Sequence, residues 1–258
     1  MAILTDIHHL SGGKSFIFKD RSVLVNQYGN AVGLEVVGLE DVMNYFEDTV
    51  TDANAAEVAP EFVAPYGMSF IPIREFFANN DEETVALIGR MKGYMNWLKD
   101  TRFCPACGSQ LELSTTENAL VCPACGKIHY PRISPCIIAT IERGDEILLL
   151  RHRQRNQDIY ACMAGFVEAG ESLEHALMRE AKEETGLTIG NIRYVGSQSW
   201  PFPDQLMCGF RADCVSGELK IQEDEIMEAR WFRRGADIPA SPRPGSISWK
   251  LIHGEFDD

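Results

Sequence analysis

Three carboxylates crowd into REAKEETG, residues 179–186 of the sequence. If this segment is a helix, Glu183 and Glu184 lie about −60° and +40° around the axis from Glu180, so all three share one face. Unneutralised like charges at this spacing cost roughly a few tenths of a kcal/mol per pair. Hard carboxylate oxygens suit Mg²⁺ or Mn²⁺, which would relieve the repulsion. The alternative is a solvated acidic face, which is what charge runs usually are.

The residues on either side of the segment favour the metal. From Gly165 the chain reads G-x5-E-x7-R-E-x-x-E-E-x-G, with Glu171, Arg179 and Gly186 in register. This pattern resembles the box of the Nudix hydrolases, which cleave nucleoside diphosphates linked to another group. The resemblance implies a loop–helix–loop within an α/β/α sandwich on a mixed sheet. It also implies an ion pair between Glu171 and Arg179 that braces the loop against the helix.

The same resemblance assigns the metal ligands. Glu180 and Glu184, with Glu183 alongside, would hold a divalent cation at a diphosphate. Ala164 would offer a backbone carbonyl, and Glu225 matches a further metal-binding Glu, although it could be one more charge in an acidic loop. Such a metal lowers the pKa of a bound water that attacks phosphorus. The general base is Glu183 or Glu184, which the sequence does not separate.

Two C-x-x-C pairs predict a second metal site. The segment CPACGSQLELSTTENALVCPACG places 14 residues between the pairs. Four thiolates close a tetrahedral zinc site without an open position, so this zinc would be structural. A disulfide pair or unpaired thiols are the alternatives, and a reducing compartment disfavours the disulfides. The ligands are Cys104, Cys107, Cys122 and Cys125; we expect the scattered Cys136, Cys162, Cys208 and Cys214 to be small buried hydrophobes.

The elements around the box follow from hydrophobic patterns. Ser172 is a plausible cap of the box helix and Gly186 its stop. Upstream, 135–153 reads as a hairpin with a Gly-Asp turn and 159–171 as a strand entering a glycine-rich loop. Downstream we expect strands at 192–200, 206–215 and 228–232, and a closing helix from about Ser246. This mixed order predicts an α/β sandwich.

The first hundred residues are harder to interpret. Short strands with a Tyr-Gly-Asn turn are expected within 15–38, and 52–60 (DANAAEVAP) reads as a polar connection. Asn80 would cap a helix with Glu83 three residues later. We therefore expect an N-terminal α+β domain, a zinc ribbon and a Nudix domain, at 1–100, 101–130 and 131–256.

A second motif narrows the substrate. SQSWPFPDQLM at 197–207, with the ribbon directly ahead of the box domain, resembles the NADH pyrophosphatase (NAD diphosphatase) subfamily, whose marker is SQPWPFPxS. The resemblance spans roughly residues 80–254. Ser199 stands where the subfamily has Pro, and Gln205 where it has Ser. We expect the lost Pro to leave the loop less rigid at its start, and the lost Ser to remove a small hydroxyl near the substrate.

The resemblance carries substrate contacts onto this chain. Aromatic faces stack on nucleotide rings and prolines stiffen the loop that carries them. Core packing is the less favoured alternative for Trp200 and Phe202. Tyr130 and Phe166 would contact the nicotinamide end. The other expected contacts are Gln198, Ser199, Trp200, Pro201, Phe202, Pro203, Asp204, Gln205, Ser248 and, from the partner subunit of a homodimer, Arg74.

The charge and composition of the chain exclude some classes of protein. With 24 basic against 38 acidic residues the net charge is −14, which argues against a protein built mainly to grip nucleic acid. No stretch approaches the ~18 apolar residues of a membrane span, and the start lacks the pattern of a signal peptide, so we expect a cytoplasmic protein.

The predicted activity is metal-dependent hydrolysis of NADH or NAD⁺ to nicotinamide mononucleotide and AMP. Removal of NAD caps from RNA 5′ ends would use the same site. A broader hydrolase of diphosphate-linked nucleosides or of dinucleoside polyphosphates is an alternative. A nucleotide-sensing zinc-ribbon regulator is another, and this one is disfavoured because every box carboxylate is present.

Overall fold

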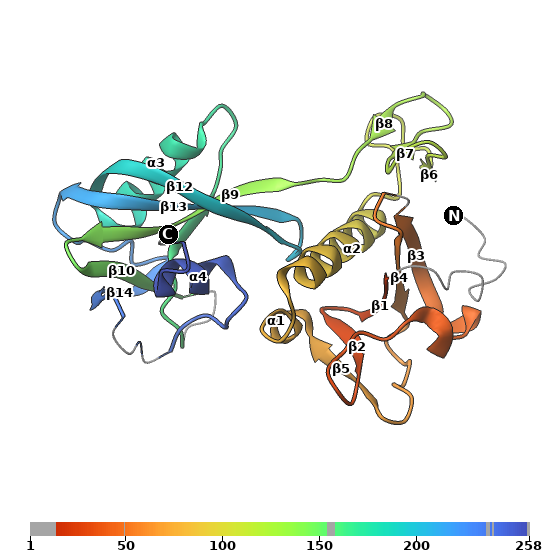
Figure 1. The fold of residues 1–258 in the computed structure, drawn as a ribbon. Coiled ribbons are helices and arrows are strands. Elements are labelled where there is room, and N and C mark those ends of the chain that lie inside the picture. The colour runs from red at the N-terminus through yellow and green to blue at the C-terminus, as the bar shows by residue number, and fades with distance from the viewer. Residues whose placement is uncertain (1–13, 49, 154–157, 236–237, 239, 257–258) are drawn as a thin grey trace. The chain divides into compact units, whose positions relative to one another are not determined.

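The computed structural model describes residues 14–48, 50–153, 158–235, 238 and 240–256, and the chain forms two compact units (Figure 1). The first unit runs to Ile133 and also includes Pro201–Asp204. The second unit comprises Ser134–Trp200 and Gln205–Asp258. Each unit contains its own sheet.

A six-stranded mixed sheet forms the second unit. Its order is β12-β13-β9-β10-β14, and β11 pairs with β9. β13 runs parallel to β9, whereas the other described pairs are antiparallel. The predicted hairpin, box strand and downstream strands are confirmed as β9 (Ser134–Arg143), β10 (Glu146–His152), β11 (Met163–Phe166), β12 (Thr188–Trp200), β13 (Gln205–Ser216) and β14 (Ile226–Arg233).

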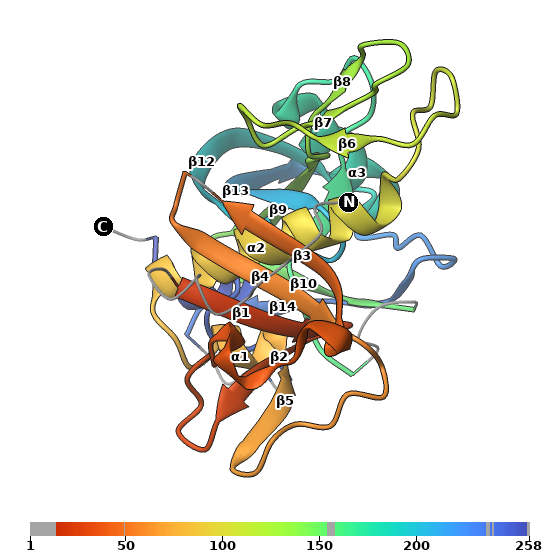
Figure 2. The same cartoon turned by 90° about the vertical axis from the view of Figure 1, so that its right-hand side faces the viewer.

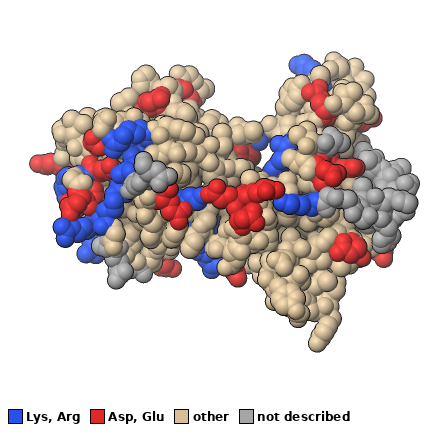
Figure 3. Space-filling model, viewed as in Figure 1, with Lys and Arg blue, Asp and Glu red and all other residues tan. Residues whose placement is uncertain are grey.

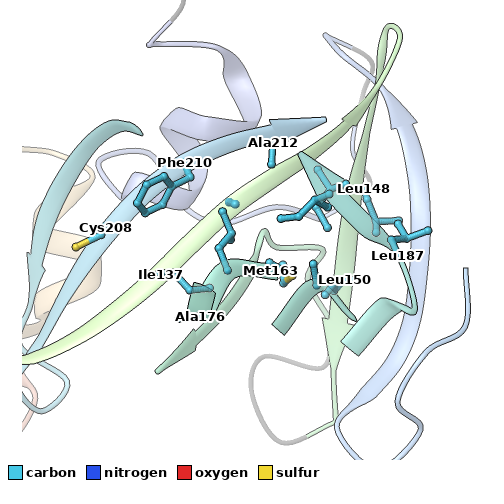
Figure 4. Close-up of a cluster of buried hydrophobic side chains, with 14 of the residues drawn as sticks. Ile137, Leu148, Leu150, Met163, Ala176, Leu187, Cys208, Phe210 and Ala212 are labelled. Atoms are coloured by element: carbon cyan, nitrogen blue, oxygen red, sulfur yellow. The ribbon is translucent and has the colours of Figure 1, made fainter. Parts of the chain in front are cut away.

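Side-chain alternation along β9 separates two cores. Ile137 and Ala139 point to one face of the sheet, where Ala176 and Leu177 of α3 (Leu173–Thr185) pack in the same core. Ile137 and Ala176 are labelled in this core in Figure 4. Ile138 points to the other face, toward α4 (Ile247–His253). Helices on both faces of a mixed sheet make the predicted α/β/α sandwich, which is confirmed.

The first unit contains a five-stranded sheet in the order β3-β4-β1-β2-β5. β1 and β4 are parallel, and the other pairs are antiparallel. Helix α2 packs across β3, β4 and β1 (Figure 2). The bounds are β1 Lys14–Lys19, β2 Ser22–Asn26, β3 Val42–Asp48, β4 Ala53–Val58, β5 Met68–Pro72, α1 Ile73–Phe77 and α2 Glu82–Asp100, with 3₁₀ turns at Leu34–Val36 and Leu39–Asp41.

The prediction of a polar connection at 52–60 is wrong. Residues 53–58 are β4, an inner strand whose side chains are all buried. Small alanines allow α2 to lie close on the sheet. The charge of Glu57 is compensated because Asn44 Nδ2 donates to it at 2.9 Å and Lys92 Nζ lies 3.8 Å away. A composition rich in Ala, Asn and Glu concealed a core strand.

The predicted cap of α2 is also wrong, by one residue. Asp81, not Asn80, is the N-cap, and its side chain accepts a hydrogen bond from Thr84 N at 2.8 Å. Asn80 instead donates to the carbonyl of Phe76 at 2.8 Å. The helix itself and its buried apolar stripe are as expected.

The ribbon has three short strands in the order β6-β7-β8. The two strands and polar turn predicted between the cysteine pairs are β6 (Glu112–Leu113) and β7 (Leu120–Val121), and β8 is Ile128–His129. Asn118 of the turn donates to Asp48 Oδ1 at 2.8 Å, and Arg90 of α2 donates to the same buried carboxylate at 2.6 Å. The Asp48 carboxylate therefore connects the ribbon to the N-terminal sheet and helix.

Candidate active site and zinc centre

The box helix α3 begins and ends where the sequence predicts. The Ser172 hydroxyl accepts a hydrogen bond from His175 N at 3.2 Å, which caps the N-terminus. Gly186 ends the helix in the left-handed region, with φ of 72°, and its N–H donates to Lys182 O. A side chain at 186 would be strained in that conformation.

Arg179 holds the loop and the helix together. Its Nε and Nη2 donate to the two oxygens of Glu171 at 2.7 and 3.0 Å, which is the predicted ion pair. Nη2 also donates to the carbonyl of Phe166 at 3.0 Å. The guanidinium lowers the pKa of Glu171 to about 2, so this carboxylate stays charged at neutral pH.

The same guanidinium reaches two metal-ligand candidates. Nη1 donates to Glu180 Oε1 at 2.9 Å and to Glu183 Oε2 at 3.0 Å. Burial raises the pKa of Glu180, Arg179 opposes that rise, and the negative charges of Glu183 and Glu225 add to it. Neighbouring negative charge of this kind makes a carboxylate a good cation ligand.

Gly165 lies directly against Glu180. A Cβ built on Gly165 would come within 2.1 Å of Glu180 Oε1 and 2.6 Å of its Cγ. Only glycine leaves room for this carboxylate beside β11. This close contact explains why the first residue of the box is a glycine.

Glu225 reaches this region through backbone contacts of its loop. Gln222 N donates to the carbonyl of Glu184 at 3.1 Å, and Lys220 N donates to that of Thr185 at 2.8 Å. Because the loop is fixed to the last turn of α3, the charge of Glu225 acts on Glu180. The role of Glu225 as a metal ligand stays a prediction, and the structure brings its loop to the end of the box helix.

The box carboxylates differ in exposure. Glu184 is 3% exposed and Glu180 has a side-chain exposure of 15%, whereas Glu183 has 54%. Within the described residues, these three do not bring their oxygens within 4.8 Å of one another. The donor types nevertheless suit a divalent cation, because carboxylate oxygens are the ligands that Mg²⁺ and Mn²⁺ prefer, and Glu180 and Glu183 lie close enough to share the Arg179 guanidinium.

Three further predicted residues lie in the second unit. Ala164 belongs to β11, half-buried against the α4-side core, and Phe166 is 43% exposed at the strand's end. Ser248 of α4 accepts a hydrogen bond at its Oγ from Cys162 N at 3.4 Å. Of the four scattered cysteines, Cys214 is half-buried and the other three are buried, as expected.

The first residues of the second motif, up to Trp200, lie in the second unit and make contacts within it. Gln198 donates to the carbonyl of Gly245 and accepts from Ile247 N, both at 2.7 Å. Trp200 packs partly buried against the α4-side core, while Ser199 is exposed. Gln198 therefore positions the N-terminus of α4, a role that the sequence did not suggest.

The rest of that motif, Pro201–Asp204, belongs to the first unit. Asn96 Nδ2 of α2 donates to the carbonyls of Pro201 and Pro203 at 3.2 and 2.8 Å. The Arg74 guanidinium lies 4.9 Å from the centre of the Phe202 ring.

Two more residues of the first unit contact this segment. The Phe77 ring lies 6.5 Å from that of Phe202, and Arg132 pairs with Asp204 at 3.1 Å. Sequence reasoning missed Asn96, Phe77 and Arg132, since no local pattern links them to contact partners that lie between 72 (204 − 132) and 125 (202 − 77) residues away.

Tyr130, also in the first unit, is 60% exposed. A side-chain hydrogen bond with Glu117 raises the pKa of its phenol. The structure therefore connects it to the ribbon turn that carries Glu117. Gln205 begins β13 and is half-buried.

The four predicted zinc ligands do converge. Their sulfur atoms all lie within 4.8 Å of one another, with 3.7 Å between Cys104 and Cys125 and 3.4 Å between Cys107 and Cys122. Sulfurs at the corners of a zinc tetrahedron are about 3.8 Å apart for Zn–S of about 2.3 Å. The donor set fits structural zinc, and His129 Nε2 lies 3.6 Å from Cys104 Sγ.

Sandwich, box and ribbon define the class: a Nudix-fold protein that carries a zinc ribbon. Residues 131–240 match the NUDIX domain, and residues 99–130 match the NADH pyrophosphatase zinc ribbon domain. Among solved structures, a NUDIX hydrolase from Nitrosomonas europaea is 24% identical with a TM-score of 0.46, over 60% of this chain and 87% of that one.

Curated relatives place the chain more narrowly. A Pseudomonas aeruginosa protein named NAD-capped RNA hydrolase NudC is 43% identical over 72% of this chain and 66% of its own length. A Haemophilus influenzae protein of the same name is 43% identical over 68% of each. The chain belongs to the family of these NudC proteins. It spans slightly less than two thirds of the length of the Pseudomonas relative.

No helix among the described residues is long and apolar enough to cross a membrane.

Proposed function

We propose that this protein hydrolyses the diphosphate of NADH and NAD⁺, giving nicotinamide mononucleotide and AMP, and that it removes NAD caps from RNA 5′ ends. The observation that carries the proposal is the packing of Glu180 against Gly165 beside the Arg179–Glu171 pair. The name of the relatives, NAD-capped RNA hydrolase, supports the substrate.

Glu180, Glu184, Glu225 and the carbonyl of Ala164 would hold Mg²⁺ or Mn²⁺. The ion, when bound, neutralises the diphosphate and lowers the pKa of an attacking water. Glu183 or Glu184 accepts the proton of that water, which adds to one phosphorus while the bridging oxygen leaves with the other. Arg179 keeps Glu180 and Glu183 oriented during this step.

The proposed substrate contacts are those that the family resemblance gave. Phe166 and Tyr130 would contact the nicotinamide end. Ser248, Arg74 and residues 198–205 would complete the pocket of a homodimer in the cytoplasm. The exposed ring of Phe166 and the exposed phenol of Tyr130 support stacking.

A broader specificity is the second candidate, because Ser199 and Gln205 depart from the subfamily marker. Turnover of free NADH and of an NAD-capped oligonucleotide, compared at equal enzyme concentration, tests the substrate assignment. The proposal expects cleavage of both. Cleavage of the oligonucleotide alone would contradict the small-molecule part of the proposal.

Gly165→Ala should lower metal-dependent hydrolysis about 10²-fold, because the new methyl group displaces the Glu180 carboxylate. Thermal stability should change little, since the Glu180 side chain can swing away. Initial rates and a melting curve measure both. Gly93→Ala is the control, because a Cβ there meets nothing within 4 Å. Wild-type activity in Gly165→Ala would contradict the role given to Glu180.

Asn96→Asp should raise the KM for NADH about tenfold, while kcat stays within about threefold. The carboxylate cannot donate to the carbonyls of Pro201 and Pro203, and it repels them. Steady-state kinetics separates the two constants. Glu83→Gln, an exposed change on the same helix, serves as control. An unchanged KM would show that the conformation of 201–204 does not govern substrate binding.

A further inference from the structure

The loop between β13 and β14 carries Glu225, the metal-ligand candidate that lies outside the box. This loop follows the last turn of α3, where Gln222 N donates to the carbonyl of Glu184 at 3.1 Å. A Cβ built on Gly217 would come within 2.8 Å of the carbonyl oxygen of Gly186. The loop therefore lies as close to the end of the box helix as a glycine permits.

Arg153, which follows β10, also holds this loop. Its backbone N–H donates to the carbonyl of Glu225 at 2.8 Å, and its Nε donates to the carbonyl of Glu223. Ile226, the next residue along the chain, is fully buried in the α3-side core. The backbone of Glu225 is therefore fixed from α3, from β10 and from the core beneath the sheet.

Gln222 contacts both Glu184 and Glu225. In addition to the hydrogen bond from its N–H to Glu184, its carbonyl accepts from Glu225 N at 3.1 Å and from Ile226 N at 2.8 Å, which closes a turn. Its side-chain Nε2 donates to Glu225 Oε1 at 3.4 Å. One half-buried residue thus links the main chain of a box carboxylate to the carboxylate outside the box.

Charge alone does not distinguish Glu225 from its neighbours. Glu223 and Asp224 are exposed acidic residues of the same loop, and Figure 3 shows acidic side chains scattered over the visible face of both units. Two observations single out Glu225. Its negative charge adds to the burial that raises the pKa of Glu180, and its carboxylate accepts the hydrogen bond from the Gln222 amide.

We propose that Gln222 is a positioning residue for the catalytic metal, because it sets the direction of the Glu225 carboxylate relative to Glu184. This inference rests on the proposed function, in which both residues hold one divalent cation. Carboxylates that bind metals are commonly oriented by a hydrogen bond from another residue. An amide donor restricts the carboxylate without exhausting the lone pairs that a cation needs, so less side-chain entropy is lost when the ion binds.

Binding of Mn²⁺ to the zinc-containing protein without nucleotide tests this role. The electron paramagnetic resonance signal of the free ion gives the dissociation constant. Gln222→Met keeps the side-chain length and the backbone hydrogen bonds but removes the amide, and should raise this constant about fivefold. Gln222→Asn keeps an amide but is one methylene group shorter, so it should lose about the same factor.

Hydrolysis of NADH provides the second measurement. In Gln222→Met the Mg²⁺ concentration for half-maximal rate should rise about fivefold, while kcat at saturating Mg²⁺ stays within about twofold. The melting temperature should not change, whereas a residue that only stabilised the loop would lower it. Asp224→Asn is the control, since it removes an exposed charge from the same loop and should change the Mn²⁺ constant less than about twofold.

Glu225→Gln separates this inference from the proposed function. It should raise the Mn²⁺ dissociation constant at least about tenfold, and adding Gln222→Met should then have no further effect, because the amide has lost its charged partner. An unchanged constant in Glu225→Gln would remove Glu225 from the metal site and overturn both proposals. A raised constant in Glu225→Gln, together with an unchanged constant in Gln222→Met or with independent effects of the two substitutions, would overturn the role of Gln222 alone.

Discussion

Glu184→Gln is expected to lower metal-dependent hydrolysis of NADH about 10³-fold. The side chain is 3% exposed on the last turn of the box helix, and the substitution keeps its shape while removing its charge. A neutral amide is a poor ligand for a hard cation and a poor proton acceptor. Both roles proposed for Glu184 are therefore lost together.

Fold and zinc content should be unchanged in this variant. Initial rates across a range of Mg²⁺ and Mn²⁺ concentrations, together with a melting curve, establish both points. Glu174→Gln, an exposed change in the first turn of the same helix, should retain full activity. Undiminished hydrolysis by Glu184→Gln would remove this residue from the metal site.

Cys122→Ser is expected to release the zinc and destabilise the first unit by several kcal/mol. Structural zinc contributes apparent binding energies of about 10–16 kcal/mol in small zinc domains, and folding of the ribbon depends on it. The Cys122 thiol is buried. Loss of the ribbon would also remove the hydrogen bond from Asn118 to Asp48, leaving a buried carboxylate with fewer donors.

Zinc content per chain and thermal unfolding of the variant measure this effect. Cys214→Ser, a half-buried thiol outside the cluster, should keep both the zinc and the melting temperature. Equal zinc content in Cys122→Ser and the wild type would contradict the four-cysteine site.

The segments that were predicted correctly from the sequence are those whose structure depends on residues close by in the chain. The box helix, its Ser172 cap and its Gly186 end depend on neighbours within a few residues, and each was found where expected. The four cysteines likewise converge because each pair is local and the ribbon between them is short. In these segments, spacing in the sequence determines spacing in three dimensions.

The features that the sequence did not predict depend on contacts between residues far apart in the chain. Residues 53–58 become a core strand because β1 and β3 flank them and α2 supplies Lys92 for Glu57, none of which their own composition indicates. The net charge of −14 does not indicate that Arg193, Arg211 and Arg234 meet at Glu142, because they come from two strands and a turn that are distant in the sequence. Asn96 contacts 201–204 across about a hundred residues.

Product analysis tests the central claim most directly. NADH, NAD⁺, ADP-ribose, diadenosine tetraphosphate and FAD would each be incubated with the protein and Mg²⁺ or Mn²⁺, and the products resolved. We predict equal amounts of nicotinamide mononucleotide and AMP from NAD⁺, the corresponding reduced mononucleotide and AMP from NADH, and the highest kcat/KM on these two. Release of nicotinamide and ADP-ribose, or no cleavage of either dinucleotide with metal present, would contradict the assignment of this site as a dinucleotide diphosphatase.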